Sequence, residues 1–283
     1  MSDDADLTLR EVLDVLEDLY PAHSAQSWDR VGLVTGDPEQ SVRRIHLAVD
    51  PTLTVIAEAR ELGADLLVTH HPLLLRGVHS IATTSAKGAS VTDLVVGDVA
   101  LFVAHTNADV AEHGVGLALA RACGLTDTEP LTLAEGQPLG RVGDLEDAVS
   151  LRSFVDALAS RLPAGAGGIR VAGAPDAVVR RVALLGGSGD DLFDAVRASG
   201  ADVYVTADLR HHPALEAREE ARGGTPYLVD AGHWASEYVW LEWAQRALVA
   251  GLGERATRVE THISTVRTDP WTFVVGADPG GMP

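Results

Sequence analysis

The sequence contains a single cysteine and, at Lys87, a single lysine. The lone Cys123 excludes an internal disulfide framework and any zinc site built from several cysteines. No apolar run is long enough to cross a bilayer, and the amino-terminal MSDDADLTLR lacks the features of a signal peptide. We therefore expect a cytoplasmic protein with no membrane partner, in which any metal is bound by His, Asp and Glu.

Basic residues are scarce as a group, because 22 Lys and Arg stand against 41 Asp and Glu and the net charge is −19. A phosphate backbone requires a basic footprint, and the only adjacent basic pairs are Arg43–Arg44 and Arg180–Arg181. The composition predicts that nucleic acid is not a partner. A length of 283 residues suffices for two domains or one large one.

One stretch of the chain occurs twice. Residues 42–71 (VRRIHLAVDPTLTVIAEARELGADLLVTHH) align without a gap with residues 179–208 (VRRVALLGGSGDDLFDAVRASGADVYVTAD). In each copy a short apolar strand, an amphipathic helix and a second apolar strand follow one another, which indicates a βαβ unit. Apolar βαβ units resemble one another by composition alone, but the ungapped match favours an internal duplication.

The duplication predicts the fold class. Continuous apolar strands joined by helices are typical of parallel sheets covered on both faces. We predict an α/β fold with two related α/β domains, each with a mostly parallel sheet flanked by helices. The domain that carries the metal site is expected to be discontinuous, comprising residues 1–127 and about 226–283. The second, related domain is expected to span about 128–225.

Two adjacent histidines, His70 and His71, follow a predicted buried strand. Neighbouring side chains in a strand point to opposite faces, so two imidazoles that act together need a strand end, where the alternation breaks. Pro72 stops the strand and holds His71 extended. Ligands in open α/β sheets bind at the carboxyl ends of strands, which favours a functional role. The alternative is a pair of solvated loop histidines.

Two other segments place a histidine four residues before an acid, namely His105 before Asp109 and His233 before Glu237. Positions i and i+4 share a helix face, so each pair has the spacing of two ligands on one helical turn. Each pair alone also has an ordinary interpretation. Asp109 is a candidate helix cap, and Glu237 is placed to interact with a helix dipole.

A fourth segment contains Asp208, His211 and His212, and Asp208 is the repeat counterpart of His71. The two histidines either line a pocket or lie on the exposed face of a helix. Imidazole and carboxylate ligands without thiolate suit Zn, Fe or Mn. Five or six such ligands exceed what one catalytic ion takes, so the count favours two ions bridged by a carboxylate.

The sequence resembles the Nif-three-like family of dinuclear-metal-centre hexamers, the GTP cyclohydrolase 1 type 2 homologs. The resemblance spans nearly the whole chain, and the order of its motifs makes it specific. These motifs are WDRVGLVTG (28–36), THHP (69–72), AHTNADVAEHGVG (104–116), RVALLGGSG (181–189), TADLRHHPALEA (206–217), DAGHWASE (230–237) and TDPW (268–271).

The resemblance implies a two-domain α/β chain assembled as a ring-shaped homohexamer, with a metal pair facing an internal cavity. It also implies that two divalent ions are bound, and that His105 is either a ligand or a group close to the ligands. The implied ligands are His70, His71, Asp109, His233 and Glu237.

Three functions are compatible with these residues. The first is a metal-dependent hydrolase in which a metal-activated water attacks a nucleotide-like or phosphoester substrate, with His105, or His211 and His212, as proton carriers. Its most specific version is the GTP cyclohydrolase reaction, which opens a nucleotide ring. The second is a non-catalytic metal-binding scaffold or regulatory protein. The third is a transcription-related interaction protein, for which the charge of −19 leaves only protein partners.

Overall fold

The computed structural model describes residues 7–276. The chain divides into two compact units. Unit 1 comprises Met1–Ala118, Leu133–Leu139 and Glu237–Thr268, and unit 2 comprises Leu119–Thr132, Gly140–Ser236 and Asp269–Pro283. The structure contains one five-stranded and one six-stranded sheet, each accompanied by helices, so the predicted two-sheet α/β class is confirmed.

The five-stranded sheet belongs to unit 1 and has a parallel centre. Its strand order is β1-β4-β3-β2-β11, in which only β1 runs antiparallel to its neighbour. All four residues of the central β3 are buried, as expected for a strand covered on both faces. The strands are β1 (Gly32–Thr35), β2 (Arg44–Ala48), β3 (Leu66–Thr69), β4 (Ala100–Val103) and β11 (Glu260–Ile263).

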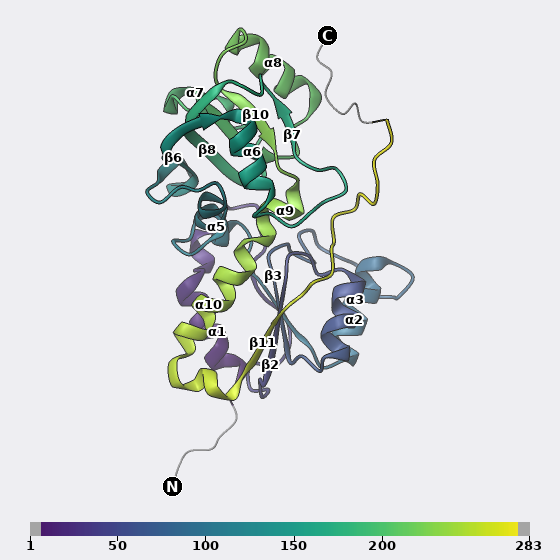
Figure 1. The fold of residues 1–283 in the computed structure, drawn as a ribbon. Helices are drawn as coiled ribbons and strands as arrows, with labels where there is room; N and C mark the ends of the chain where they lie inside the picture. The colour runs from purple at the N-terminus through teal and green to yellow at the C-terminus, as the bar shows by residue number, and fades with distance from the viewer. Residues whose placement is uncertain (1–6, 277–283) are drawn as a thin grey trace. The chain divides into compact units, whose positions relative to one another are not determined.

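Helices cover both faces of this sheet (Figure 1). The pair α2 (Leu53–Glu61) and α3 (Ala86–Val96) packs together on one face, and α1 (Leu9–Leu19) and α10 (Trp240–Leu252) pack together on the other. Local sequence explains where α1 begins, because Thr8 and Glu11 form a reciprocal capping box. The short α4 (Thr106–Val110) and α5 (Val115–Ala122) follow β4.

The six-stranded sheet lies in unit 2, apart from the tip of its first hairpin, and has the order β5-β6-β8-β9-β10-β7. Its central strands β8, β9 and β10 are parallel, whereas β6 and β7 pair antiparallel with β8 and β10. The strands are β5 (Glu129–Ala134), β6 (Gln137–Ser150), β7 (Arg170–Ala172), β8 (Val178–Ser188), β9 (Val203–Ala207) and β10 (Tyr227–Asp230).

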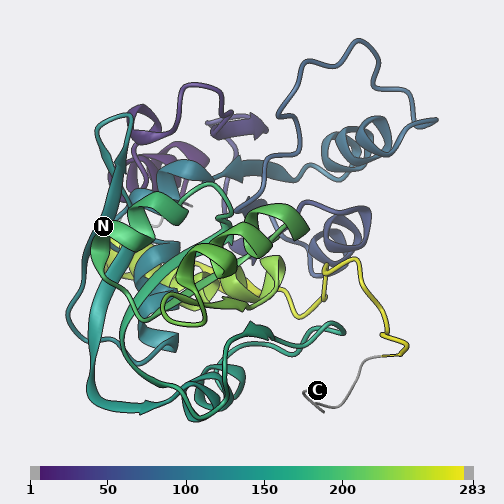
Figure 2. The same cartoon turned by 90° about the horizontal axis from the view of Figure 1, so that it is seen from above.

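The helices of unit 2 follow from this topology. Helix α7 (Phe193–Ser199) connects β8 to β9, and α8 (His211–Ala221) connects β9 to β10, the next strand in the same direction along the sheet. Since such connections between parallel strands are right-handed, both helices lie on the same face of the sheet. They lie above the sheet in Figure 1 and in front of it in Figure 2. The unit also contains α6 (Leu151–Ala159) and the start of α9 (His233–Tyr238).

The repeated sequence forms the same structure twice, as β2-α2-β3 and β8-α7-β9. The glycine of each Gly-Ala-Asp lies in the left-handed region that ends a helix, with φ of 64° at Gly63 and 69° at Gly200. Asp65 accepts hydrogen bonds from two successive backbone N–H groups of residues 43 and 44. Asp202 does the same with residues 180 and 181, which explains the aspartate in both copies.

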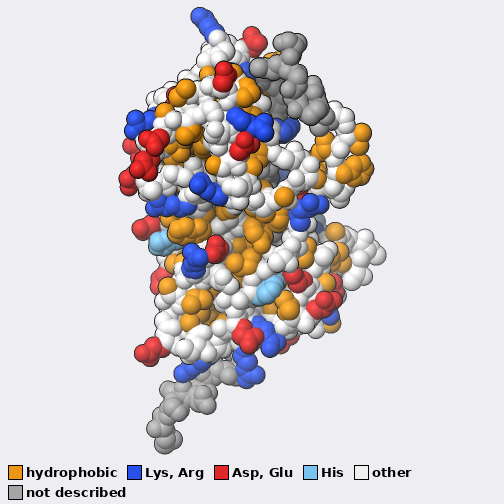
Figure 3. Space-filling model, in the orientation of Figure 1, with side chains coloured by type: hydrophobic (Ala, Val, Ile, Leu, Met, Phe, Trp, Pro, Cys, Tyr) orange, Lys and Arg blue, Asp and Glu red, His pale blue; other side chains and the backbone are white. Residues whose placement is uncertain are grey.

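The described surface fits the composition. On the face shown in Figure 3, Lys and Arg side chains lie singly or in small groups among acidic and apolar ones. Within residues 7–276, no helix has both the length and the hydropathy needed to span a bilayer.

Candidate metal centre

The carboxyl ends of β3 and β4 bring histidines together in unit 1. His70 and His71 follow β3 directly, and His105 lies two residues beyond β4. The backbone N–H groups of His70 and His71 donate to the carbonyls of Ala48 and Val49, so the main chain still follows β2 while the side chains are redirected. The two rings lie with their centroids 5.0 Å apart. The strand end therefore delivers both imidazoles to one place.

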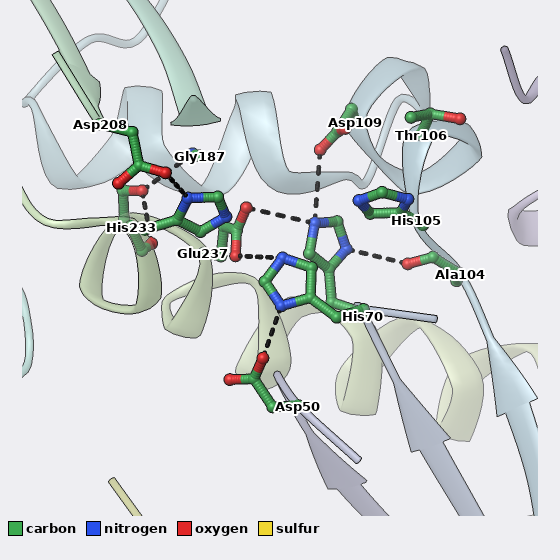
Figure 4. Close-up of polar contacts among 12 residues, drawn as sticks. Asp50, His70, Ala104, His105, Thr106, Asp109, Gly187, Asp208, His233 and Glu237 are labelled. Carbon is green, nitrogen blue, oxygen red and sulfur yellow. Dashed lines mark hydrogen bonds and ion pairs between the residues drawn. The ribbon is translucent and has the colours of Figure 1, made fainter. Parts of the chain in front are cut away.

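His70 is fully buried, and each of its ring nitrogens has a distinct environment. Its Nδ1 lies 2.9 Å from the carbonyl oxygen of Ala104, so Nδ1 carries a hydrogen, and in the neutral ring Nε2 carries the lone pair (Figure 4). Nε2 has no hydrogen-bond partner within residues 7–276, and it lies 3.5 Å from Glu237 Oε1 and 3.7 Å from Asp109 Oδ1. A buried acceptor facing two carboxylates is an arrangement that a bound cation satisfies.

His71 is held between two carboxylates. Its Nδ1 lies 2.7 Å from Asp50 Oδ1, and its Nε2 lies 3.1 Å from Glu237 Oε2. Burial by itself lowers the pKa of His71, but the charges and hydrogen bonds of Glu237 and Asp50 outweigh burial and raise that pKa to about 10. A carboxylate therefore faces each of the two ring nitrogens of His71.

His105 is oriented in the same manner by Asp29. His105 Nδ1 lies 2.9 Å from Asp29 Oδ1, and Asp29 Oδ2 accepts from the backbone N–H and the hydroxyl of Thr106. Burial alone raises the pKa of Asp29, but the hydrogen bonds from His105 and Thr106 hold it well below its usual range. Nitrogens of His70, His71 and His105 lie within 4.8 Å of one another, a grouping that suits a metal ion.

Two acids from different helices complete this part of unit 1. Glu237 is buried on α9, and Asp109 lies on α4. Burial and the charge of Glu237 raise the pKa of Asp109 to about 7. Asp109 lies beside His70 instead of capping a helix. The Asn107 side-chain oxygen accepts a hydrogen bond from the backbone N–H of His105. Two carboxylates that both face His70 Nε2 favour a cation beside them.

The remaining predicted residues lie in unit 2. His233 is the first residue of α9, one helical turn before Glu237, and its Nδ1 lies 2.7 Å from Asp208 Oδ2 (Figure 4). His211 and His212 begin α8 and are exposed, with their rings in an edge-on contact. His233 therefore has the same carboxylate-oriented Nδ1 as His71 and His105.

Sequence reasoning missed the carboxylates that orient two of the histidines. Asp50 fixes His71 from the end of β2, and Asp29 fixes His105 from the loop before β1. A metal-binding histidine commonly donates its other ring N–H to a carboxylate or carbonyl, so Asp50 and Asp29 belong to the candidate centre. Asp50 follows a predicted strand directly, and this position was the signal available to find it.

Comparison with known proteins identifies the family. The family model described as Duf34/NIF3 (NGG1p interacting factor 3) matches residues 7–270. The chain belongs to the DUF34/NIF3 family.

Similar members of the DUF34/NIF3 family match over nearly their whole length. The GTP cyclohydrolase 1 type 2 homolog of Streptomyces coelicolor is 48% identical, with 96% of each chain covered. The homolog of Mycobacterium tuberculosis is 33% identical, with 94% of this chain and 97% of the relative covered. A Bacillus cereus protein related to NIF3 has a crystal structure that superposes with a TM-score of 0.86 at 26% identity, covering 96% and 100% of the two chains. The predicted resemblance is confirmed.

Replacing Asp29 in this DUF34/NIF3 protein is expected to destabilise unit 1. Asp29→Asn removes a fully buried charge that holds His105 and Thr106, and hydrogen bonds to charged groups contribute about 1.5–3 kcal/mol each. Urea unfolding at pH 7 measures the loss. Because the folded-state pKa of Asp29 is depressed, this contribution is complete above about pH 4 and declines as the pH falls below it.

The exposed Asp18→Asn on α1 is the matched control, and its unfolding free energy is expected to stay within about 0.5 kcal/mol of wild type. Equal effects of the two substitutions at pH 7 would show that Asp29 does not hold the loop.

Proposed function

We propose that this protein is a metal-dependent hydrolase whose centre binds two divalent ions through His70, His71, Asp109, His233 and Glu237. The buried Nε2 of His70, which faces Glu237 and Asp109 without a hydrogen-bond partner within residues 7–276, is the observation that supports metal binding most directly. Imidazole and carboxylate ligands suit Zn, Fe or Mn.

The orientation of Glu237 supports a pair of ions over a single one. Its Oε1 faces His70 Nε2 at 3.5 Å, and its Oε2 faces His71 Nε2 at 3.1 Å. With each oxygen directed to a different imidazole, Glu237 would hold two ions. Asp109, beside His70, and His233, one helical turn before Glu237 on α9, would complete the set of ligands.

When bound, divalent ions at such a centre supply Lewis acidity and lower the pKa of a coordinated water. The substrate class that fits this chemistry is a nucleotide-like molecule or a phosphoester. His105 is proposed to transfer a proton during hydrolysis. Asp29 binds its Nδ1 and so fixes the tautomer, which leaves Nε2 free to face the nitrogens of His70 and His71. A proton-carrying role for His211 and His212 stays a prediction.

Replacing His105 with alanine tests this function. Hydrolysis of a panel of nucleotides and phosphoesters by the metal-loaded protein is expected to fall about 10²–10⁴-fold in kcat, the usual contribution of a positioned proton carrier. Metal content, measured by elemental analysis, is expected to stay at the wild-type level. The exposed His113→Ala, in the loop after α4, is the matched control and should retain activity.

Two other results would change the proposal. Metal binding without turnover by wild-type protein across the panel would favour the non-catalytic scaffold. Joint loss of metal and activity in His105→Ala would make His105 a ligand.

The ring-shaped homohexamer implied by the resemblance is also kept as a proposal, and light scattering of the purified protein tests it.

A further inference from the structure

Unit 2 contains a hollow that uses none of the proposed metal ligands. It has a volume of about 350 Å³ and is bounded by the edge strand β7, by Leu228 and Asp230 of β10, and by α8 with the preceding Leu209. This volume falls within the range of small-molecule sites, about 300–1,000 Å³. We call it the α8 hollow. Its size is sufficient for an organic molecule and larger than a single ion requires.

One stripe of α8 faces the hollow. His211, Ala214, Leu215 and Arg218 line it, and their spacing of i, i+3, i+4 and i+7 places them on one helix face. The three glutamates of the same helix, at positions 216, 219 and 220, are absent from the lining. In a strongly acidic chain, this helix therefore presents an apolar and basic face to the hollow.

The single acid in the lining is neutralised where it lies. Asp230 is buried, pairs with Arg170 across the β10–β7 ladder and accepts hydrogen bonds from the N–H groups of Leu209 and Gly232. Its charge is thus offset by a guanidinium and two backbone donors. Asp230 leaves no net negative charge to repel an anion from the hollow.

Arg218 carries the positive charge that remains. Its Nη1 donates to the carbonyls of Gly224 and Pro226, and its guanidinium lies 5.2 Å from the ring centre of Tyr227. Carbonyls and an aromatic ring orient a cation without neutralising it, and Arg218 forms no ion pair within residues 7–276. Burial lowers the pKa of Arg218, as expected of a guanidinium partly removed from water without a counter-charge.

Apolar surface separates the two ends of the hollow. His211 and Arg218 are seven residues apart, which corresponds to about 10 Å along a helix. Between them lie Ala214 and Leu215 opposite Ala172 and Leu228, and Leu215 remains 48% exposed. Such an exposed apolar surface next to an unpaired cation favours a ligand that has both an apolar body and an anionic group.

We propose that the α8 hollow is a second binding site, which takes a small organic anion with an apolar body, its acid group on Arg218. A carboxylate, phosphate or sulfonate forms charge-assisted hydrogen bonds with the guanidinium, and the chain or ring covers the stripe of α8. The site lies wholly in unit 2, so it goes beyond the proposed hydrolase activity and does not require it.

The probe 8-anilino-1-naphthalenesulfonate has the required chemistry, since it joins a sulfonate to aromatic rings. Titrated into the full-length protein, it is expected to show saturable fluorescence enhancement with one site per chain, in the presence of metal or of chelator alike. Octanoate should displace it and octan-1-ol at the same concentration should not. Added NaCl should weaken binding, because the attraction between the charges is screened.

Variants locate the site. Arg218→Gln is expected to weaken probe binding by about 10-fold or more, Arg218→Lys should restore most of it, and Ala214→Phe should abolish it by filling the hollow. Arg152→Gln is the matched control, because Arg152 is an exposed arginine of α6 that does not line the hollow. Near-UV circular dichroism checks that each variant is folded, since unfolded chains also bind the probe.

Three outcomes would overturn the proposal. Equal displacement by octanoate and octan-1-ol would remove the requirement for an anion. Unchanged binding in folded Ala214→Phe, or in folded Arg218→Gln if the first variant does not fold, would place the probe elsewhere. Binding that is seen only after Trp271→Ala, in the exposed segment near the carboxyl terminus, would identify that segment as the occupant.

Discussion

Replacing Glu237 with alanine is expected to weaken metal binding by at least about 100-fold, because the loss of a ligand costs more than the 10–100-fold associated with the loss of an outer partner. Glu237 is buried, and its two oxygens face His70 and His71 separately. If it bridges two ions, both are lost together. Elemental analysis of the purified variant and calorimetric titration of chelated protein with Zn²⁺ or Mn²⁺ measure the effect.

The matched control is Glu242→Ala on the neighbouring α10, where the carboxylate is exposed and pairs with Arg246. This variant should bind metal as the wild type does. Wild-type metal content in Glu237→Ala would exclude the proposed centre. Loss of one ion with retention of the other would exclude the bridge while leaving a mononuclear site.

Replacing Trp240 with alanine is expected to lower the free energy of unfolding by about 3–5 kcal/mol, the usual effect of removing a large buried aromatic side chain. Trp240 is fully buried at the start of α10. Its ring lies 5.5 Å from that of Tyr20 and 5.4 Å from that of His70. The substitution also removes the ring that packs against His70, so the affinity of the centre for metal should fall. Urea unfolding of protein treated with a chelator measures the loss of stability, and a separate metal titration of the folded variant measures the loss of affinity.

Trp271→Ala is the control, because Trp271 is 70% exposed and its removal should change stability by no more than about 0.5 kcal/mol. A similarly small effect of Trp240→Ala would show that α10 contributes little to the packing of unit 1. Reduced stability with unchanged metal affinity would show that His70 is positioned by its bond to Ala104 alone.

Sequence patterns predicted the positions in the proposed metal centre that depend on local structure. The end of β3 redirects His70 and His71 because strand alternation breaks there, and this follows from the apolar run and Pro72. Asp109 is different, because its spacing from His105 fitted a helix cap equally well. Only the packing of α4 near the end of β3 shows that the Asp109 side chain lies beside His70 and does not cap a helix.

The two carboxylates that orient His71 and His105 could not be predicted from local sequence, because they come from other parts of the chain. Asp50 reaches His71 from just beyond the end of the adjacent strand β2, and Asp29 reaches His105 from a loop more than seventy residues earlier. Neither carboxylate stands at a fixed spacing from its histidine along the chain, since strand order and loop path set these distances. The α8 hollow likewise exists only because β7 pairs with the far edge of β10.

By itself, the chain's order of residues determined the α/β class, the duplicated βαβ unit and the acidic, thiol-poor character that restricts metal ligands to His, Asp and Glu. These properties depend on periodicity and composition, which are local or additive. The tertiary structure alone decided which atoms face one another: the Nε2 of His70 toward two carboxylates and, among residues 7–276, Arg218 beside the α8 hollow without a carboxylate partner. Such juxtapositions arise from long-range packing, in which side chains remote in sequence share a buried volume.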